Sequence, residues 1–288
     1  MNIKKVIPSG YCKGVVNAIK IAKQTRVDYP NENIYILGML VHNTYVSKEL
    51  EQLGIITLDD TNIGKMQLLD TINDGIVIFT AHGISKEIKD KAIQKGLKCV
   101  DATCDDVLKT QNIIKKYVND GYDIIYFGKK NHPEADAVLS ISEKIHLVST
   151  INDLNNLNIS NNKIFLTNQT TISYLELNEL IEKAKHIYPN IVIENEICNA
   201  TSSRQLAITS LTDCDLLYVV GDSKSNNTNK LVEIGIKHGI KKVLLIQNFK
   251  EINKNDLIGI DNIYVTAGAS TPPVLIDEVI KYLSSILS

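Results

Sequence analysis

The stretch Asn195-Glu196-Ile197-Cys198-Asn199-Ala200-Thr201 decides how this chain is organised, because its cysteine recurs twice in matching surroundings. Cys12 and Cys104 precede Cys198 at nearly even intervals, each about a third of the chain apart. Apolar residues at helical spacing follow each of the three cysteines. A cysteine at the start of a helix lies at the positive end of the helix dipole, which favours the thiolate that metals bind. We therefore expect three thiolates, one from each repeat, to meet at one metal centre.

Each cysteine and its helix are followed by an apolar strand that ends in glycine, and then by a polar loop. These first strands are Ile34 to Gly38, Ile124 to Gly128 and Leu217 to Gly221. A second helix and a second strand follow in each repeat, and threonines occupy matching places in the second strands: Thr80, Thr167 and Thr266. A further helix is expected after each second strand, over residues 85–95, 173–186 and 272–287.

Strands that alternate with helices predict parallel sheets with crossover helices, and a threefold repeat predicts three similar α/β domains. We expect these small α/β units to span 1–101, 102–195 and 196–288, the last with a C-terminal helix. The polar loops all fall at the carboxyl ends of strands, where α/β proteins bind ligands. The prediction is a pseudo-threefold trefoil around one central site. The Asn-rich segment 152–162 is expected to be a surface loop.

Composition narrows the class of protein. Apolar residues make up 44% of the chain and charged residues 22%, with a net charge of −2, which is typical of a globular protein and does not indicate a nucleic-acid surface. No apolar run approaches the roughly 20 residues of a membrane helix, and the first residues lack the features of a signal peptide. We expect a cytoplasmic protein whose five cysteines form no disulfides.

The post-strand loops carry side chains suited to a small phosphorylated ligand. Because the chain has only two arginines, imidazoles, hydroxyls and amides would have to hold most of the phosphate. The candidates are His42, His82, His132, Thr171, Ser225, Asn227 and Ser270. Glu134 is the best-placed carboxylate, and burial would raise its pKa so that it carries a proton at neutral pH.

The three repeated cysteines leave one coordination position of a metal centre open. A cluster of four irons normally takes four thiolates, so three would leave one iron free for water or substrate. Zinc with three thiolates and a water is the alternative, and the spacing does not separate the two. Cys99 and Cys214 lie outside the repeat and are expected to be small buried hydrophobic residues rather than ligands.

Taken together, these motifs resemble the 4-hydroxy-3-methylbut-2-enyl diphosphate reductases, the last enzymes of the non-mevalonate isoprenoid pathway. The matching elements run in family order along almost the whole chain: Gly10-Tyr11-Cys12-Lys13-Gly14-Val15, Val41-His42-Asn43, Thr80-Ala81-His82-Gly83, Asp101-Ala102-Thr103-Cys104, His132-Pro133-Glu134, Thr167-Asn168-Gln169-Thr170-Thr171, Ile197-Cys198-Asn199-Ala200-Thr201, Ser225-Asn226-Asn227 and Thr266-Ala267-Gly268-Ala269-Ser270. Each element alone is weak, but the ordered set is specific.

The resemblance implies a 4Fe-4S cluster held by Cys12, Cys104 and Cys198, with the hydroxyl of the substrate on the fourth iron. It also implies that Glu134, assisted by Thr170 and His132, delivers protons. The diphosphate would be held by His42, His82, His132, Ser225, Asn227 and Ser270, with Asn226, where some relatives carry serine, as a further contact. The family removes the hydroxyl with two electrons and two protons, giving isopentenyl and dimethylallyl diphosphate. Electrons would come from a ferredoxin or flavodoxin.

Two other functions share parts of this pattern. A quinolinate-synthase-like enzyme would also be a trefoil with three cysteines and an open cluster, but with different polar loops. A non-enzymatic iron–sulfur sensor would need neither a buried glutamate nor three histidines in the loops. The chain also departs from the family in having Asp105, where proline usually follows the middle cysteine.

Overall fold

The computed structural model describes residues 1–58 and 63–287. Within them the chain forms three four-stranded sheets flanked by helices, and every strand pairing is parallel. The predicted α/β class with parallel sheets is thereby confirmed. No helix in these ranges is both long and apolar enough to cross a membrane.

The first sheet in the chain has the strand order β3-β2-β4-β5. Its strands are β2 (Ile34–Leu37), β3 (Ile55–Leu58), β4 (Ile76–Phe79) and β5 (Lys98–Asp101). The helices of this part are α1 (Lys13–Asp28), α2 (Thr44–Gln52), α3 (Lys65–Asp70) and α4 (Lys86–Gln94). Ser85 caps α4 by accepting a hydrogen bond from the backbone N–H of Ile88, so this helix begins where the sequence predicts.

The second sheet has the order β7-β6-β8-β9. Its strands are β6 (Asp123–Phe127), β7 (Ile145–Val148), β8 (Ile164–Asn168) and β9 (Val192–Ile193). The helices are α5 (Asp105–Asn119), α6 (Pro133–Leu139), α7 (Ile151–Asn155) and α8 (Tyr174–Ile187). The expectation of a loop over 152–162 is wrong at its start, because Thr150 and Asp153 form a reciprocal capping box that begins α7.

The third sheet has the order β1-β12-β10-β11. Its strands are β1 (Asn2–Lys5), β10 (Leu216–Val220), β11 (Lys242–Ile246) and β12 (Asn262–Ala267). The helices are α9 (Asn199–Thr209), α10 (Asn226–Lys237), the short 3-10 turns η1 (Phe249–Glu251) and η2 (Lys254–Leu257), and α11 (Pro273–Leu287).

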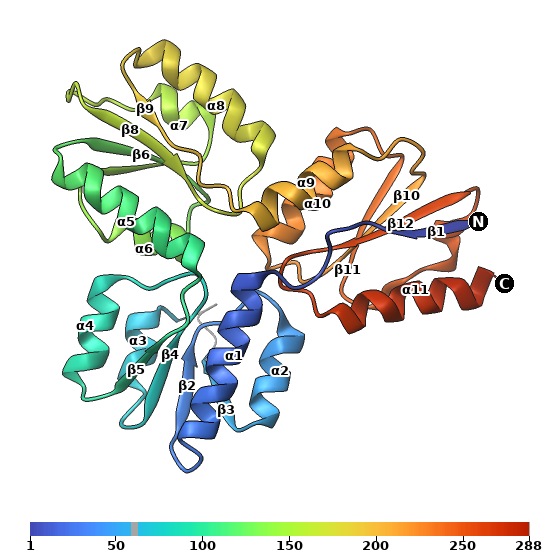
Figure 1. Cartoon of the computed structure of the whole chain (residues 1–288), viewed down its shortest axis with the longest axis horizontal. Coiled ribbons are helices and arrows are strands. Elements are labelled where there is room, and N and C mark those ends of the chain that lie inside the picture. The colour runs from blue at the N-terminus through green and yellow to red at the C-terminus, as the bar shows by residue number, and fades with distance from the viewer. Residues whose placement is uncertain (59–62, 288) are drawn as a thin grey trace. The chain divides into compact units, whose positions relative to one another are not determined.

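All three sheets share one order, in which the strand before a cysteine forms an edge. The strand β5 precedes Cys104 and pairs with β4, while β9 precedes Cys198 and pairs with β8. In the same way β1 precedes Cys12, and it pairs with β12 at the other end of the chain (Figure 1). The first strand therefore lies within the predicted unit 1–101 in sequence, but in the third sheet in space.

The contacts among the described residues divide the chain into two compact units. One comprises Met1–Val15, His42–Val46 and Asn199–Ser288, and contains the third sheet. The other comprises Val16–Val41 and Ser47–Cys198, and contains the first and second sheets. We call them the terminal unit and the central unit.

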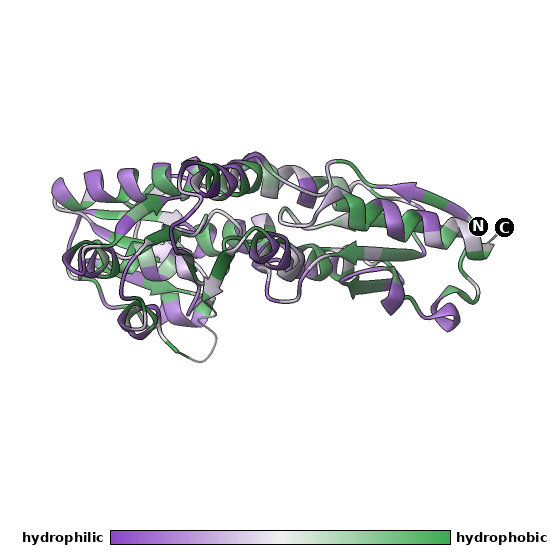
Figure 2. Ribbon diagram, turned by 90° about the horizontal axis from the view of Figure 1, so that it is seen from below, coloured by the Kyte–Doolittle hydropathy of each residue, from purple (hydrophilic) through white to green (hydrophobic). Residues whose placement is uncertain are grey.

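Burial explains why the inner strands read as unbroken apolar runs. All residues of β4, β8 and β10 are buried, as expected for parallel strands covered by helices on both faces. In Figure 2 the strands are mostly hydrophobic, whereas the helices alternate between hydrophobic and hydrophilic residues. The rigid inner strands end at the polar loops that carry the candidate site residues.

Candidate functional site

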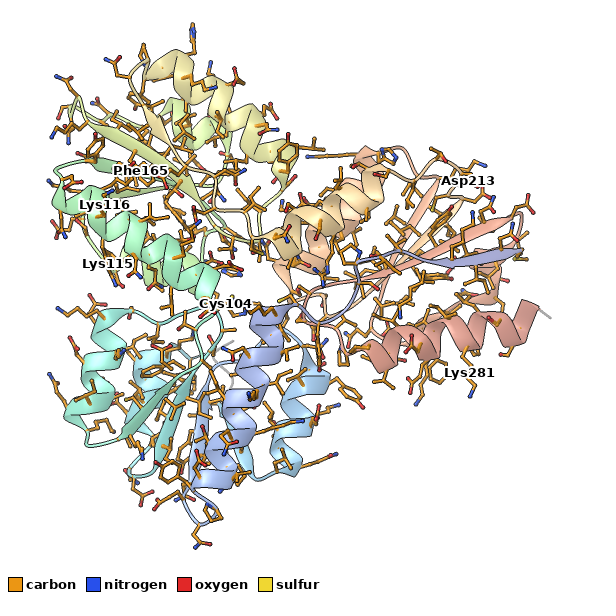
Figure 3. The ribbon with its side chains drawn as sticks, viewed as in Figure 1. Cys104, Lys115, Lys116, Phe165, Asp213 and Lys281 are labelled. Carbon is orange, nitrogen blue, oxygen red and sulfur yellow. The ribbon has the colours of Figure 1, made fainter. Side chains whose placement is uncertain are left out.

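The three repeated cysteines all stand directly before a helix, as predicted. Cys104 is the N-cap of α5, and Cys12 and Cys198 immediately precede α1 and α9. None of the three forms a disulfide, and all three are partly exposed. In Figure 3 the helix α5 runs from Cys104 toward Lys115 and Lys116. Thiols at the positive ends of helices and open to ligands have the environment in which cysteine binds metals.

The backbone holds the three cysteines in equivalent places. The N–H of Cys12 donates to the carbonyl of Ala269 at 3.0 Å, in the loop after β12. The N–H of Cys104 donates to Ala81 O at 3.0 Å after β4, and the N–H of Cys198 donates to Thr170 O at 3.1 Å after β8. Each cysteine is thus fixed to the loop at the carboxyl end of a buried inner strand, which is where the repeat predicts a ligand site.

The sulfur of Cys12 also receives a donor from its own helix. The backbone N–H of Val15 donates to Cys12 Sγ at 3.4 Å. An N–H in the first turn of a helix stabilises negative charge on the sulfur. Cys12 belongs to the terminal unit, and Cys104 and Cys198 belong to the central unit. Cys99 and Cys214 lie outside this pattern, and burial raises the pKa of both thiols, that of Cys214 to about 11.

Glu134 is a buried carboxyl group at the start of α6 in the central unit. Its side chain is 1% exposed. One oxygen, Oε1, accepts a hydrogen bond from the backbone N–H of Thr170 at 2.8 Å, and Oε2 accepts one from Thr170 Oγ1 at 2.9 Å. Desolvation raises the pKa of Glu134 from 4.5 to about 7, although the bonds from Thr170 act in the opposite direction. At neutral pH this group can therefore hold or release a proton.

His132 fixes the start of the helix that carries Glu134. It is the N-cap of α6, and its Nδ1 accepts a hydrogen bond from the backbone N–H of Glu134 at 3.2 Å. Pro133 occupies the first helical position, where a missing N–H costs nothing. The ring of His82 meets that of His132 edge to face, with centroids 5.4 Å apart. The central unit therefore brings His82, His132, Glu134 and Thr170 into one cluster.

Thr171 lies next to this cluster and is partly exposed. Its Oγ1 accepts a hydrogen bond from Gln169 Nε2 at 3.0 Å. The hydroxyl of Tyr126 lies 3.5 Å from Glu134 Oε1. The sequence suggests Tyr126 only as a core residue. The signal that could have revealed this contact is a phenol in a buried strand whose polar end needs a partner.

The remaining predicted residues lie in the terminal unit, around the start of α10 and the loop after β12. Ser225 is the N-cap of α10, with Asn226 and Asn227 as the first two helical residues, and all three are buried. Asn227 donates from Nδ2 to Thr201 Oγ1 at 3.1 Å and accepts at Oδ1 from the Ala269 N–H at 3.0 Å. The start of a helix with buried hydroxyl and amide groups is a suitable place for an anion.

Ser270 connects this loop cluster to His42. The hydroxyl of Ser270 donates to the backbone carbonyl of His42 at 3.0 Å. His42, Ser225, Asn227 and Ser270 therefore all belong to the terminal unit. The other predicted phosphate contacts, His82, His132 and Thr171, belong to the central unit.

Sequence reasoning missed an ion pair in the central unit. Lys109 Nζ lies 2.9 Å from Glu196 Oε1, and the glutamate side chain is only 6% exposed. The pair joins α5, which begins after Cys104, to the segment that leads into Cys198. Glu196 stands two residues before that cysteine, in the stretch that defines the repeat, but its burial could not be read from the sequence.

A protein-family model described as "LytB protein" matches residues 3–284, which is nearly the whole chain. The chain belongs to the LytB protein family. The family resemblance inferred from the motifs is thereby confirmed.

Curated relatives in this family carry one enzyme name. A 4-hydroxy-3-methylbut-2-enyl diphosphate reductase of Malacoplasma penetrans is 46% identical over 295 residues, covering 100% of this chain and 98% of the relative. One from Geobacillus kaustophilus is 44% identical over 287 residues, covering 98% and 90%.

Solved structures of LytB-type reductases agree over almost the full chain. The E-1-hydroxy-2-methyl-but-2-enyl-4-diphosphate reductase of Plasmodium falciparum is 33% identical with a TM-score of 0.89, covering 99% of this chain and 88% of that chain. A second structure, described as the terminal enzyme of the non-mevalonate pathway, is 26% identical with a TM-score of 0.69, covering 99% and 100%.

Proposed function

We infer that this chain is a 4-hydroxy-3-methylbut-2-enyl diphosphate reductase, which catalyses the last step of the non-mevalonate isoprenoid pathway. The observation that carries this inference is the similarity of 44–46% identity, over nearly the full length, to enzymes of that name. The reaction replaces the C–O bond of the allylic alcohol with a C–H bond. Two electrons and two protons are consumed, the oxygen leaves as water, and isopentenyl and dimethylallyl diphosphate are the products.

We propose that Cys12, Cys104 and Cys198 hold a 4Fe-4S cluster with one iron left open. Three thiols outside disulfides, at equivalent helix starts, are the donor set that such a cluster needs, so these residues fit it. When bound, the cluster would supply electrons and a Lewis-acidic iron for the substrate hydroxyl.

The chain's own part in the chemistry is proton delivery. Glu134 is protonated in part at neutral pH, because burial raises its pKa to about 7. Thr170 holds both carboxyl oxygens through its N–H and its hydroxyl, which fixes the orientation of the carboxyl group. His132 sets the position of Glu134 through the cap of α6. We propose that Glu134 protonates the departing oxygen, with Thr170 and His132 assisting.

We propose that the diphosphate is bound by uncharged donors. Imidazole, hydroxyl and amide groups can offset much of the desolvation of an anion in a closed pocket. The proposed contacts are His42, His82, His132, Thr171, Ser225, Asn226, Asn227 and Ser270. The start of α10, a helix of 12 residues, adds a favourable dipole.

We further propose a cytoplasmic enzyme that takes electrons from a ferredoxin or flavodoxin. Cysteines that form no disulfides within the described residues are typical of a reducing compartment.

Turnover by the reduced protein tests the function directly. Anaerobically purified protein, reduced chemically and incubated with 4-hydroxy-3-methylbut-2-enyl diphosphate, should yield both isomeric products. An intact cluster without turnover would defeat the reductase and would favour a sensor or a quinolinate-synthase-like enzyme. Zinc in place of iron and acid-labile sulfide would defeat the proposed cofactor.

A further inference from the structure

The segment His42–Val46 runs from the loop after β2 into the first residues of α2, and it belongs to the terminal unit. The residues on either side of it, Val16–Val41 and the segment beginning at Ser47, belong to the central unit. These five residues are bonded to loops of the third sheet through Asp222 and Ser270. One of the bonds that hold this segment comes from Asp222, which has no role in the function proposed above.

Asp222 makes the side-chain bond that attaches this segment to the loop after β10. Its Oδ2 accepts a hydrogen bond from the backbone N–H of Thr44 at 3.1 Å. Its other oxygen, Oδ1, accepts one from the backbone N–H of Lys224 at 2.9 Å, within the loop that leads to Ser225. One carboxylate thus joins the backbone two residues after His42 to the backbone one residue before Ser225.

The surroundings of Asp222 suit a buried negative charge. The residue is 4% exposed. Thr44 is the first residue of α2, and the carbonyl of Asp222 itself accepts from the N–H of Ser225, the N-cap of α10. The carboxylate therefore lies near the positive ends of two helices, and both of its oxygens are bonded. Loss of either bond would remove a hydrogen bond to a charged and buried acceptor.

Ser270 also bonds to this segment, and Asn43 makes bonds within it. Ser270 Oγ donates to His42 O at 3.0 Å, and Asn43 Oδ1 accepts from the N–H groups of Tyr45 and Val46 at 3.0 and 3.3 Å. Asn43 thus shapes the turn internally, whereas Asp222 and Ser270 attach it to the third sheet's loops. Of these two, Asp222 has each of its carboxylate oxygens bonded to a backbone N–H group.

We propose that Asp222 is a positioning residue for the diphosphate. It fixes the backbone of the His42 segment to the loop of Ser225 and Asn227, so that the phosphate contacts of the terminal unit are assembled before the ligand arrives. This rests on the proposed function, because it takes His42, Ser225 and Asn227 as phosphate contacts. Asp222 itself touches neither the ligand nor the reacting atoms. Pre-assembly raises affinity because less ordering is needed on binding.

The test compares Asp222→Ala and Asp222→Asn with the wild type. Binding of inorganic pyrophosphate is measured by calorimetry, and KM and kcat are measured with the diphosphate substrate. The matched control is Thr150→Ala, which removes a helix-cap bond from α7, a helix without proposed site residues. Melting temperature is recorded for every variant.

We expect the Kd for pyrophosphate and the KM of Asp222→Ala to rise about tenfold or more while kcat stays within about threefold, since only ligand binding is affected. Asp222→Asn should show a smaller rise in the same direction, because its single oxygen can accept only one of the two bonds. Thr150→Ala should lower the melting temperature without changing the Kd.

Two results would overturn the proposal, and each is distinguishable from failure of the proposed function. Wild-type affinity for pyrophosphate in both Asp222 variants would show that the segment needs no fixing by this residue. A fall in kcat at unchanged KM would show that Asp222 acts on the chemical step. A wild-type protein that neither binds pyrophosphate nor reduces the substrate would remove the proposed function and this proposal with it.

Discussion

Replacing Glu134 with glutamine is the substitution whose consequences the structure defines most fully. Glutamine keeps the shape of the side chain and can still accept the Thr170 N–H bond through its amide oxygen, but it has no acid proton to give. Loss of a positioned general acid typically lowers the rate by roughly a hundred- to ten-thousand-fold. We expect a loss of kcat in this range, with cluster content and substrate affinity retained.

The same substitution should change how stability depends on pH. The pKa of Glu134 is about 7 in the folded protein against an ordinary 4.5, and each pKa unit corresponds to about 1.4 kcal/mol. Between these two values the folded protein binds more protons than the unfolded chain, so ionisation destabilises the fold as pH rises. This destabilisation is absent below about pH 4.5 and complete above about pH 7, where it is about 3 kcal/mol. Glutamine does not titrate, so the variant lacks this pH-dependent destabilisation.

The assay combines turnover with urea unfolding at several pH values. The free energy of unfolding of Glu134→Gln should rise relative to that of the wild type as the pH increases from 5 to 8. Asp136→Asn is the matched control, because Asp136 is exposed on the same helix two residues further on. Turnover of Glu134→Gln near that of the wild type would remove Glu134 from the mechanism. A stability difference independent of pH would refute its raised pKa.

Three further substitutions have defined outcomes. Cys104→Ser should lose most of the bound iron and acid-labile sulfide, whereas Cys99→Ser should retain both; equal content in the two variants would contradict the assignment of ligands. Thr170→Val removes a hydrogen bond that lowers the pKa of Glu134, so the alkaline limb of the kcat profile should move to higher pH; a shift to lower pH would contradict the geometry. Lys109→Ala removes the cation that pairs with the buried carboxylate of Glu196. Because the lysine side chain is 63% exposed, we expect the free energy of unfolding in urea to fall by only about 1 kcal/mol. An unchanged free energy of unfolding would show that water fully replaces the lysine as the partner of the carboxylate.

Sequence periodicity predicted the parts of the fold that local patterns determine. The inner strands β4, β8 and β10 are buried on both faces and therefore read as apolar runs. Apolar residues at helical spacing follow each cysteine, so the helix starts could be inferred. The pattern did not reveal that α9 buries Thr201, Arg204 and Gln205 beside Ile208. These local signals sufficed for the α/β class and for the repeat.

The sheet to which β1 belongs could not be read from the sequence in the same way. Asn2–Lys5 has the sequence Asn-Ile-Lys-Lys, and every residue except the partly buried Ile3 is exposed. A short polar edge strand carries no pattern that selects its partner, because the choice depends on which sheet edge lies nearby in the folded chain. The threefold repeat could have suggested that β1 pairs with β12, since a strand also precedes each of the other two cysteines.

In the candidate site too, sequence patterns identified some residues, whereas a residue whose burial depends on the fold was missed. Repetition pointed to the cysteines, and the polar loops after buried strands pointed to Glu134 and the histidines. Asp222 was missed because a carboxylate in a turn with serine and lysine is typical of solvated loops. Its burial results from the packing of His42–Val46 against that turn, a contact between segments far apart in the sequence.

Electron paramagnetic resonance of the reduced, anaerobically purified protein tests the central claim most directly, because it reports both the cluster and the open position on it. The account predicts the signal of a reduced 4Fe-4S cluster in the wild-type protein and a clear change in that signal when the diphosphate substrate is added. A protein without such a signal, or a signal that saturating substrate leaves unchanged, would contradict a cluster held by three cysteines with one iron open to the substrate.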